Sequence, residues 1–230
     1  MNRIRRIVVV IGTIALVSAS VDHWWTQRHR LRDINGDGRV IVICFGDSIS
    51  GASISGSYPS RLRTYLGPSV EVINHYKNGE TTDQGKQRLP DVLKTTHPDY
   101  VVVLEGINDH CENPLITSFN LNVMASTILK AHAVPLIGTV YPPAPSDAAT
   151  RDCFEDLNKA IERIVKRTNG AIVVHFATAM HGRSDLLSDG VHPTGPGFQV
   201  LAKTAYDALT WTIAHPEVAQ TVASHAEETH

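Results

Sequence analysis

Short runs of β-branched and other apolar residues alternate with longer amphipathic stretches from Val40 onward. This alternation is typical of βαβ units, in which helices join parallel strands. The strand runs are apolar at consecutive positions, as expected when helices cover both faces of a sheet. The pattern therefore predicts an α/β fold, a three-layer α/β/α sandwich with a five-stranded parallel sheet. The predicted strands are 40–45, 70–75, 100–104, 134–140 and 171–176, and the predicted helices are 58–66, 82–94, 117–132, 153–167 and 195–212.

The first twenty residues have the three-part layout of a secretory signal. Three arginines precede an apolar run over 7–17, and small residues follow up to a plausible cleavage point after Ala19 or Ser20. As a helix this run would rise only about 16 Å, well short of a bilayer core. An uncleaved anchor, with Trp24 and Trp25 at the membrane interface, remains the alternative. Both interpretations predict export, to the periplasm or beyond the cell, and the anchor would also keep the protein near a membrane.

The chain length and composition predict one globular domain. With 42% hydrophobic and 19% charged residues, the chain can bury a sizeable core. We expect a signal peptide or anchor at 1–19, a linker and turn at 20–39, the α/β domain at 40–214, and a polar tail at 215–230 that is frayed or disordered. We expect the protein to be a monomer.

Charge and cysteine usage exclude two classes of function. The 21 basic and 23 acidic residues give a net charge of -2, without a dense basic cluster beyond the N-terminal region, so no nucleic-acid partner is predicted. The twelve histidines form no H-E-x-x-H motif, and the three cysteines are scattered singly. The sequence therefore predicts neither a metal nor another cofactor.

The segment 33–38 copies the first half of a calcium-binding loop. Such a loop needs a carboxylate at its twelfth position, which here is Cys44, inside the first predicted strand. We therefore interpret the segment as an Asx-type turn that leads into the sheet.

Polar, glycine-bearing segments follow four of the predicted strands. The carboxyl ends of parallel strands share one edge of the sheet, where α/β folds bind their ligands. We therefore expect these segments to meet. They are 46–48, 78–80, 106–109 and 189–192.

These four segments supply every group that acyl transfer by a serine requires. Ser48 offers the nucleophilic hydroxyl, His192 the base, and Asp189 the carboxylate that orients the imidazole. The oxyanion donors would be the backbone N–H groups of Ser48 and Gly79 and the side-chain amide of Asn108. Taken alone, Ser48 could be merely a helix N-cap. The two aspartates beside these groups, Asp47 and Asp109, are interpreted as structural turn and cap residues.

These same four segments resemble the conserved blocks of the GDSL-type, or SGNH, serine hydrolases. The blocks are Gly46-Asp47-Ser48-Ile49-Ser50, Asn78-Gly79-Glu80-Thr81, Gly106-Ile107-Asn108-Asp109 and Asp189-Gly190-Val191-His192. The resemblance implies a flavodoxin-like sheet and metal-independent esterase, lipase or thioesterase activity. Residues 79–90 also resemble the branch that contains periplasmic bacterial thioesterase and lysophospholipase enzymes. The departures, Ile49 with Ser50 and Ile107, remove no catalytic group.

Two cysteines, Cys111 and Cys153, follow predicted strands three and four, near the expected catalytic edge. Export would allow them to pair, so we hypothesise a disulfide between them, with free thiols as the alternative. Cys44 falls within a strand and is interpreted as a small buried hydrophobe.

The sequence thus predicts a serine esterase that forms an acyl-enzyme on Ser48 and acts on a small acyl ester or thioester. A carbohydrate O-acetylesterase of the same family is the first alternative, and a non-catalytic binding module on a hydrolase scaffold is the second. We expect the loops at 49–57, 110–116 and 141–152 to form the acyl pocket.

Overall fold

A computed structural model of the chain describes residues 30–51 and 56–227, and within them five parallel strands form one sheet. The strand order is β2-β1-β3-β4-β5, the flavodoxin-like order of doubly wound sheets. The predicted fold class is confirmed. The strands are β1 Ile41–Gly46, β2 Glu71–Tyr76, β3 Tyr100–Leu104, β4 Val134–Gly138 and β5 Ile172–Val174.

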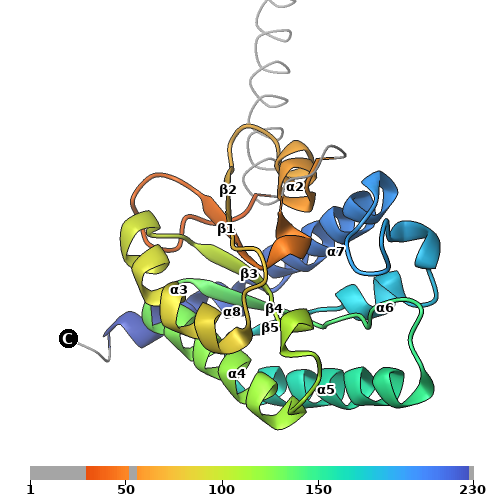
Figure 1. Cartoon of the computed structure of the whole chain (residues 1–230). Helices are drawn as coiled ribbons and strands as arrows, with labels where there is room; N and C mark the ends of the chain where they lie inside the picture. The colour runs from red at the N-terminus through yellow and green to blue at the C-terminus, as the bar shows by residue number, and fades with distance from the viewer. Residues whose placement is uncertain (1–29, 52–55, 228–230) are drawn as a thin grey trace, which may run out of the picture.

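Helices cover both faces of the sheet (Figure 1). The helices α2 and α7 pack together on one face, and α3, α4 and α5 pack side by side on the other. Right-handed crossovers produce this division, because the connection from β1 runs to one side and the later ones run to the other. The helices are α2 Tyr58–Leu66, α3 Thr82–Thr96, α4 Pro114–Lys130, α5 Ala148–Arg167, α6 Phe176–Met180, α7 Gly195–Ala214 and α8 Pro216–Glu227.

Capping residues explain where the helices begin. The Ser57 side chain accepts a hydrogen bond from the backbone N–H of Ser60, and α2 has the predicted bounds. The structure corrects the predicted starts of α4 and α5, which begin at Pro114 and Ala148. In these helices the Asn113 and Asp147 side chains act as the caps, so each helix extends back toward the preceding strand.

The core lies on both faces of the central strands. Every residue of β1, β3 and β4 is buried, which explains why these strands show no polar–apolar alternation. Cys44 in β1 is fully buried, as predicted, and burial raises the pKa of its thiol to about 12.

The tail was predicted to be frayed or disordered, but the structure shows that residues 216–227 form α8. This helix packs against α4 and α7. Its Val222 side chain is fully buried and lies near Gly170. Tertiary packing of a few apolar side chains therefore orders a segment that is polar on average.

The segment before β1 is an Asx-type turn, as predicted. The two carboxylate oxygens of Asp33 accept hydrogen bonds from the backbone N–H groups of Gly36, at 2.7 Å, and Gly38, at 2.8 Å. The predicted signal peptide or anchor at 1–19 lies outside the described residues. No helix within 30–51 and 56–227 is long and apolar enough to cross a membrane.

Candidate active site

The chain turns sharply at the end of β1, and this turn presents Ser48 at the carboxyl edge of the sheet. A Cβ at Gly46 would lie 2.4 Å from the carbonyl oxygen of Leu104, so only glycine fits beside β3. Ser48 opens a short 3-10 helix, Ser48–Ser50, and Asp47 caps it by accepting a hydrogen bond from the Ile49 N–H at 2.8 Å. Because Asp47 is the cap, the Ser48 hydroxyl is free to point elsewhere.

The structure brings Ser48, His192 and Asp189 together. The Ser48 Oγ lies 2.9 Å from Nε2 of His192, and Nδ1 of the same ring lies 2.7 Å from Oδ2 of Asp189. These are the nucleophile–base and base–orienter contacts of a serine hydrolase triad. The side chains of His192 and Asp189 are 44% and 57% exposed, so the arrangement opens directly to solvent.

Asp189 also accepts hydrogen bonds from the backbone of its own loop. Its Oδ1 accepts hydrogen bonds from the backbone N–H groups of His192, at 2.8 Å, and Val191, at 3.0 Å. These bonds stabilise the charged carboxylate and, with the His192 side chain, lower the pKa of Asp189 to about 2. Asp189 is therefore ionised at every pH at which the protein would work, and its orientation is fixed by its own loop.

Contacts from the segment after β4 hold the loop that carries Asp189 and His192. The Gly190 carbonyl accepts a hydrogen bond from the Ala144 N–H at 2.7 Å, and the Val191 carbonyl accepts one from the Tyr141 hydroxyl at 3.1 Å. Gly190 has φ +87°, and a Cβ there would lie 2.1 Å from the Ala144 carbonyl oxygen. No sequence pattern predicts this contact, because it joins segments that no shared motif connects.

The three predicted oxyanion donors lie at the ends of β1, β2 and β3. The Asn108 side-chain amide donates one hydrogen bond to the Glu80 carbonyl at 2.9 Å, which leaves its second N–H unused. Gly79, adjacent to Glu80, adopts φ +68°. Within the described part of the chain, the backbone N–H groups of Ser48 and Gly79 donate no hydrogen bond to protein.

The two neighbouring aspartates are structural, as predicted. Asp109 accepts hydrogen bonds from the Thr82 N–H at 2.8 Å and the Thr117 hydroxyl at 2.7 Å, and thereby fixes the start of α3 against the loop after β3. Asp47 is buried, and one of its carboxylate oxygens has no donor among the residues that the structure describes. Burial is the main cause that raises the pKa of Asp47 to about 7.

Two buried glutamates lie behind these loops, and the sequence reasoning assigned them no role. Glu80 is bound by Arg88, whose Nε lies 2.8 Å and 3.0 Å from the two carboxylate oxygens. Glu105 follows β3 and has no donor at either carboxylate oxygen. The available signal was a charged residue placed directly after a wholly apolar strand, where solvent exposure is not expected.

A disulfide joins Cys111 to Cys153, which confirms the predicted pairing. Cys153 lies within α5 and not on a loop, because α5 begins five residues earlier than predicted. The bond ties α5 to the loop after β3, three residues beyond Asn108.

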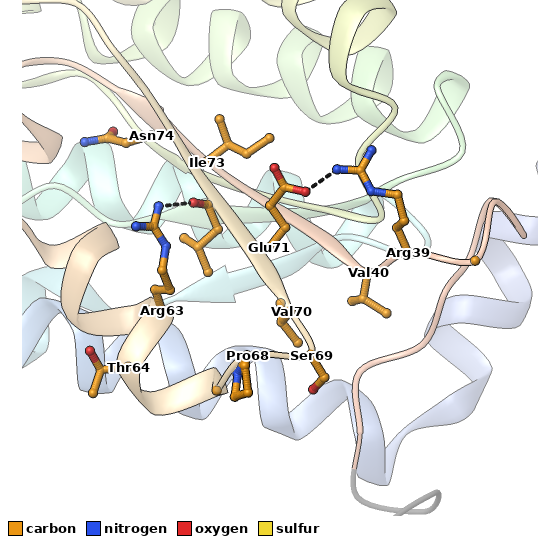
Figure 2. Close-up of a pocket in the computed structure, with 13 residues that line it drawn as sticks. Arg39, Val40, Arg63, Thr64, Pro68, Ser69, Val70, Glu71, Ile73 and Asn74 are labelled. Atoms are coloured by element: carbon orange, nitrogen blue, oxygen red, sulfur yellow. Dashed lines mark hydrogen bonds and ion pairs between the residues drawn. The ribbon is translucent and has the colours of Figure 1, made fainter.

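A pocket beside Asn108 is lined by residues of the predicted acyl-pocket segment at 110–116, including His110 and Ile116. Of the predicted segment at 49–57, residues 52–55 lie outside the described chain. A second groove runs along the β2 edge (Figure 2), where Arg39 pairs with Glu71 and Arg63 donates to the Val72 carbonyl at 2.6 Å. None of the candidate catalytic residues lines this groove.

Residues 30–51 and 56–227 contain no group of three or more His, Cys, Asp or Glu side chains arranged to hold a metal ion. Of the described histidines, His192 is the one that contacts the candidate nucleophile.

Comparisons with known proteins agree with this geometry. The profile of a family described as the GDSL-like Lipase/Acylhydrolase family matches residues 44–200. Thioesterase 1/protease 1/lysophospholipase L1 of Escherichia coli (strain K12) is 26% identical over 158 residues, covering 66% of this chain and 74% of that protein. An arylesterase of Vibrio mimicus is 28% identical over 161 residues, covering 66% and 79%. The crystal structure of TesA superposes with a TM-score of 0.63 at 25% identity, covering 74% of this chain and 97% of that one.

Proposed function

Because this chain belongs to the GDSL-like lipase/acylhydrolase family, a family of esterase-type hydrolases, we propose that it cleaves carboxylic esters or thioesters through an acyl-enzyme on Ser48. The observation that carries the proposal is the hydrogen-bonded series from Ser48 through His192 to Asp189, at 2.9 Å and 2.7 Å. A hydrolase scaffold that had lost catalysis would not be expected to keep all three groups in contact.

The reaction proceeds in two halves. Ser48 Oγ attacks the acyl carbonyl while Nε2 of His192 takes the hydroxyl proton, and the Asp189 carboxylate stabilises the imidazolium that forms. The imidazolium then passes this proton to the leaving alcohol or thiol, which departs and leaves an acyl ester on Ser48. Water, deprotonated by the same nitrogen, attacks that ester; the bond from the acyl carbon to Ser48 Oγ then breaks, the carboxylic acid departs, and the proton returned by His192 restores the Ser48 hydroxyl.

The oxyanion of each tetrahedral intermediate would be bound by the N–H groups of Ser48 and Gly79 and by the Asn108 amide. These donors make no hydrogen bond to the described residues beyond the one from Asn108 to Glu80, which supports the assignment. Donors fixed by the fold before substrate arrives stabilise developing charge without reorganisation, which is the main source of rate enhancement in acyl transfer.

The surface beside Asn108 supports an apolar acyl group as substrate. Ile116 lines the adjacent pocket, and Leu115 and Phe119 lie with it on the first turns of α4, where each of the three residues is 56% to 74% exposed. Three large apolar side chains in water next to a catalytic edge are a recognised mark of a binding surface. The thioesterase, lysophospholipase and arylesterase names of the relatives agree with an acyl substrate.

The test is a chain-length series of nitrophenyl esters, from acetate to dodecanoate, with matching acyl thioesters. Ser48→Ala should abolish turnover and labelling by a fluorophosphonate probe, while Ser69→Ala, an exposed serine in the β2-edge groove, should change neither. Activity on acetate alone would favour the carbohydrate O-acetylesterase. A wild-type protein that neither turns over nor labels would be a binding module.

We further propose that the protein is exported and acts as a monomer. The signal-like pattern at 1–20 and the Cys111–Cys153 disulfide support export, because disulfides persist in oxidising compartments. Cell fractionation with N-terminal sequencing of the mature protein would locate it and find any cleavage point. Recovery in the cytoplasm with an intact N-terminus would overturn the proposal.

A further inference from the structure

Glu105 is a buried ionisable group that the proposed mechanism does not use. It follows β3 directly, only 1% of the residue is exposed, and neither carboxylate oxygen receives a hydrogen bond from any described residue. An ionised carboxylate with no donor is among the most costly groups to bury. Its protonation state therefore needs an explanation from its surroundings.

Those surroundings contain more negative than positive groups. The buried carboxyls of Glu80 and Asp47 are the acidic groups that act on Glu105. Glu105 Oε1 lies against α3, 3.3 Å from where a Cβ on Gly85 would stand. The balancing cation is Arg88 of α3, which binds Glu80 and whose guanidinium lies 4.0 Å from the centre of the Phe45 ring. Lys77 lies farther out, 3.7 Å from Glu80 and largely exposed.

A single guanidinium cannot neutralise both glutamates. Arg88 makes its hydrogen bonds to the Glu80 carboxyl, so an ionised Glu105 would add a second, uncompensated charge to the interior. Burial is the first cause that raises the pKa of Glu105 well above its ordinary value, followed by the charges of Asp47 and Glu80, and Arg88 opposes them. A neutral carboxyl carries one O–H donor, and the acceptor in reach is the Glu80 carboxylate.

We propose that Glu105 is a positioning residue that shares one proton with Glu80, so that an O–H···O hydrogen bond joins the two loops carrying the oxyanion donors. The inference rests on the proposed esterase activity, because the two glutamates can affect turnover only if the oxyanion donors act in catalysis. A hydrogen bond from a neutral acid to a carboxylate is charge-assisted and stronger than one between neutral groups.

The neighbouring contacts explain why this pair would affect the donors. Glu80 follows Gly79 directly, and the Glu80 carbonyl accepts the Asn108 amide at 2.9 Å. Glu105 precedes Asn108 by three residues on the other loop. Loss of the shared proton would set two carboxylates against each other and push the loops apart. Because oxyanion donors act only at the right distance, a small displacement would lower kcat more than it changes KM.

The experiment compares Glu105→Gln with Glu105→Leu. The glutamine amide can donate to Glu80 without titrating, whereas leucine has a similar volume and no donor. We expect Glu105→Gln to keep kcat within about threefold of wild type and Glu105→Leu to lose at least about tenfold in kcat with little change in KM. Equal activity of Glu105→Leu and wild type, or equal loss in both variants, would overturn the proposal.

The alkaline side of the pH profile gives a second readout that a merely structural role would not move. At a pH above that at which Asp47, with its pKa of about 7, ionises, wild-type kcat should fall as the shared proton is lost. Glu105→Gln should not show this fall. An identical alkaline decline in both proteins contradicts the proposal.

Infrared spectroscopy of the wild-type protein tests the shared proton without any variant. The carbonyl stretch of a protonated carboxylic acid should persist at alkaline pH up to the point where kcat begins to fall, whereas ordinary carboxylates have no such band there. Absence of the band would exclude the shared proton even if both variants fail to fold. If the band is present but wild type hydrolyses no ester and takes no fluorophosphonate label, the proposed function has failed and the proton sharing has not.

Discussion

The hydroxyl oxygen of Ser48 lies 2.9 Å from Nε2 of His192, although 144 residues separate the two in the chain. Ser48 leaves the end of β1, and His192 lies just before α7, which packs against α2 on the same face of the sheet. The contact between Ser48 and His192 is therefore a product of the doubly wound topology, which places α7 beside α2, the helix that follows β1.

Removing the charge of Asp189 should slow turnover strongly. Asp189→Asn leaves a side chain of the same shape but favours the wrong imidazole tautomer, and we expect a loss of about 10²- to 10⁴-fold in kcat. Steady-state kinetics on a nitrophenyl ester measure it. Asp185→Asn, which removes an exposed carboxylate paired with Arg183, is the matched control and should be close to wild type. Because the pKa of Asp189 is about 2, no change in wild-type activity between pH 4 and 9 should arise from this group.

Asn108→Ala should lower kcat by about 10²- to 10³-fold with little change in KM, because the amide is proposed to act only on the oxyanion. Asn122→Ala, which removes an amide on α4 that accepts a hydrogen bond from Thr168, is the control for loss of an asparagine remote from the site. A raised KM with unchanged kcat in Asn108→Ala would show that the residue binds substrate in its ground state.

The buried Asp47 should make the protein less stable as the pH rises. Its pKa is raised from 3.8 to about 7 in the folded protein, so the folded state binds the proton more tightly than the unfolded state. Stability from this group is therefore present below about pH 4 and is lost progressively up to about pH 7, by up to about 4 kcal/mol.

Asp47→Asn keeps an oxygen for the Ile49 N–H and removes this titration. Urea unfolding should show the variant more stable than wild type at pH 8 and nearly equal to it at pH 4. Asp91→Asn, on the exposed side of α3, should follow the wild-type curve at both values. If Asp47→Asn also has the wild-type stability at both pH values, the predicted pH dependence is wrong and another contact must stabilise the Asp47 carboxylate.

The Cys111–Cys153 disulfide should contribute about 4 kcal/mol to stability, since it closes a loop with a sequence separation of 42 residues. The double variant Cys111→Ser/Cys153→Ser should have a lower melting temperature than wild type. The decrease should equal the one that reductant causes in wild type. Adding reductant to the double variant should have no further effect, because the remaining Cys44 has no partner and is buried. A reductant-sensitive double variant would contradict the pairing.

The sequence was sufficient to predict the sheet and the grouping of Ser48, His192 and Asp189, because both depend on local patterns. Strands without polar positions mark a parallel sheet, and polar residues after them must meet at one edge. The bounds of α2 were predictable for the same reason, since Ser57 and Gly67 delimit it locally.

The features that could not be predicted depend on contacts between distant segments. α8 is ordered by burial of Val222, which no local pattern in a polar tail reveals. The proposed pairing of Glu80 with Glu105 could not be predicted, because the sequence does not show that two side chains 25 residues apart are both buried behind the same loops. The caps that start α4 and α5 were visible as Asn113 and Asp147, but the apolar periodicity that defined the predictions begins after them.

Gly190 and Ala144 lie so close that the segment after β4 and the loop that carries His192 cannot move independently. Attempts to re-engineer substrate preference by lengthening or randomising 141–147 would therefore displace the imidazole and lower activity on every substrate alike. The segment at 110–116 makes no such contact with that loop, so library design for new acyl specificities should begin there.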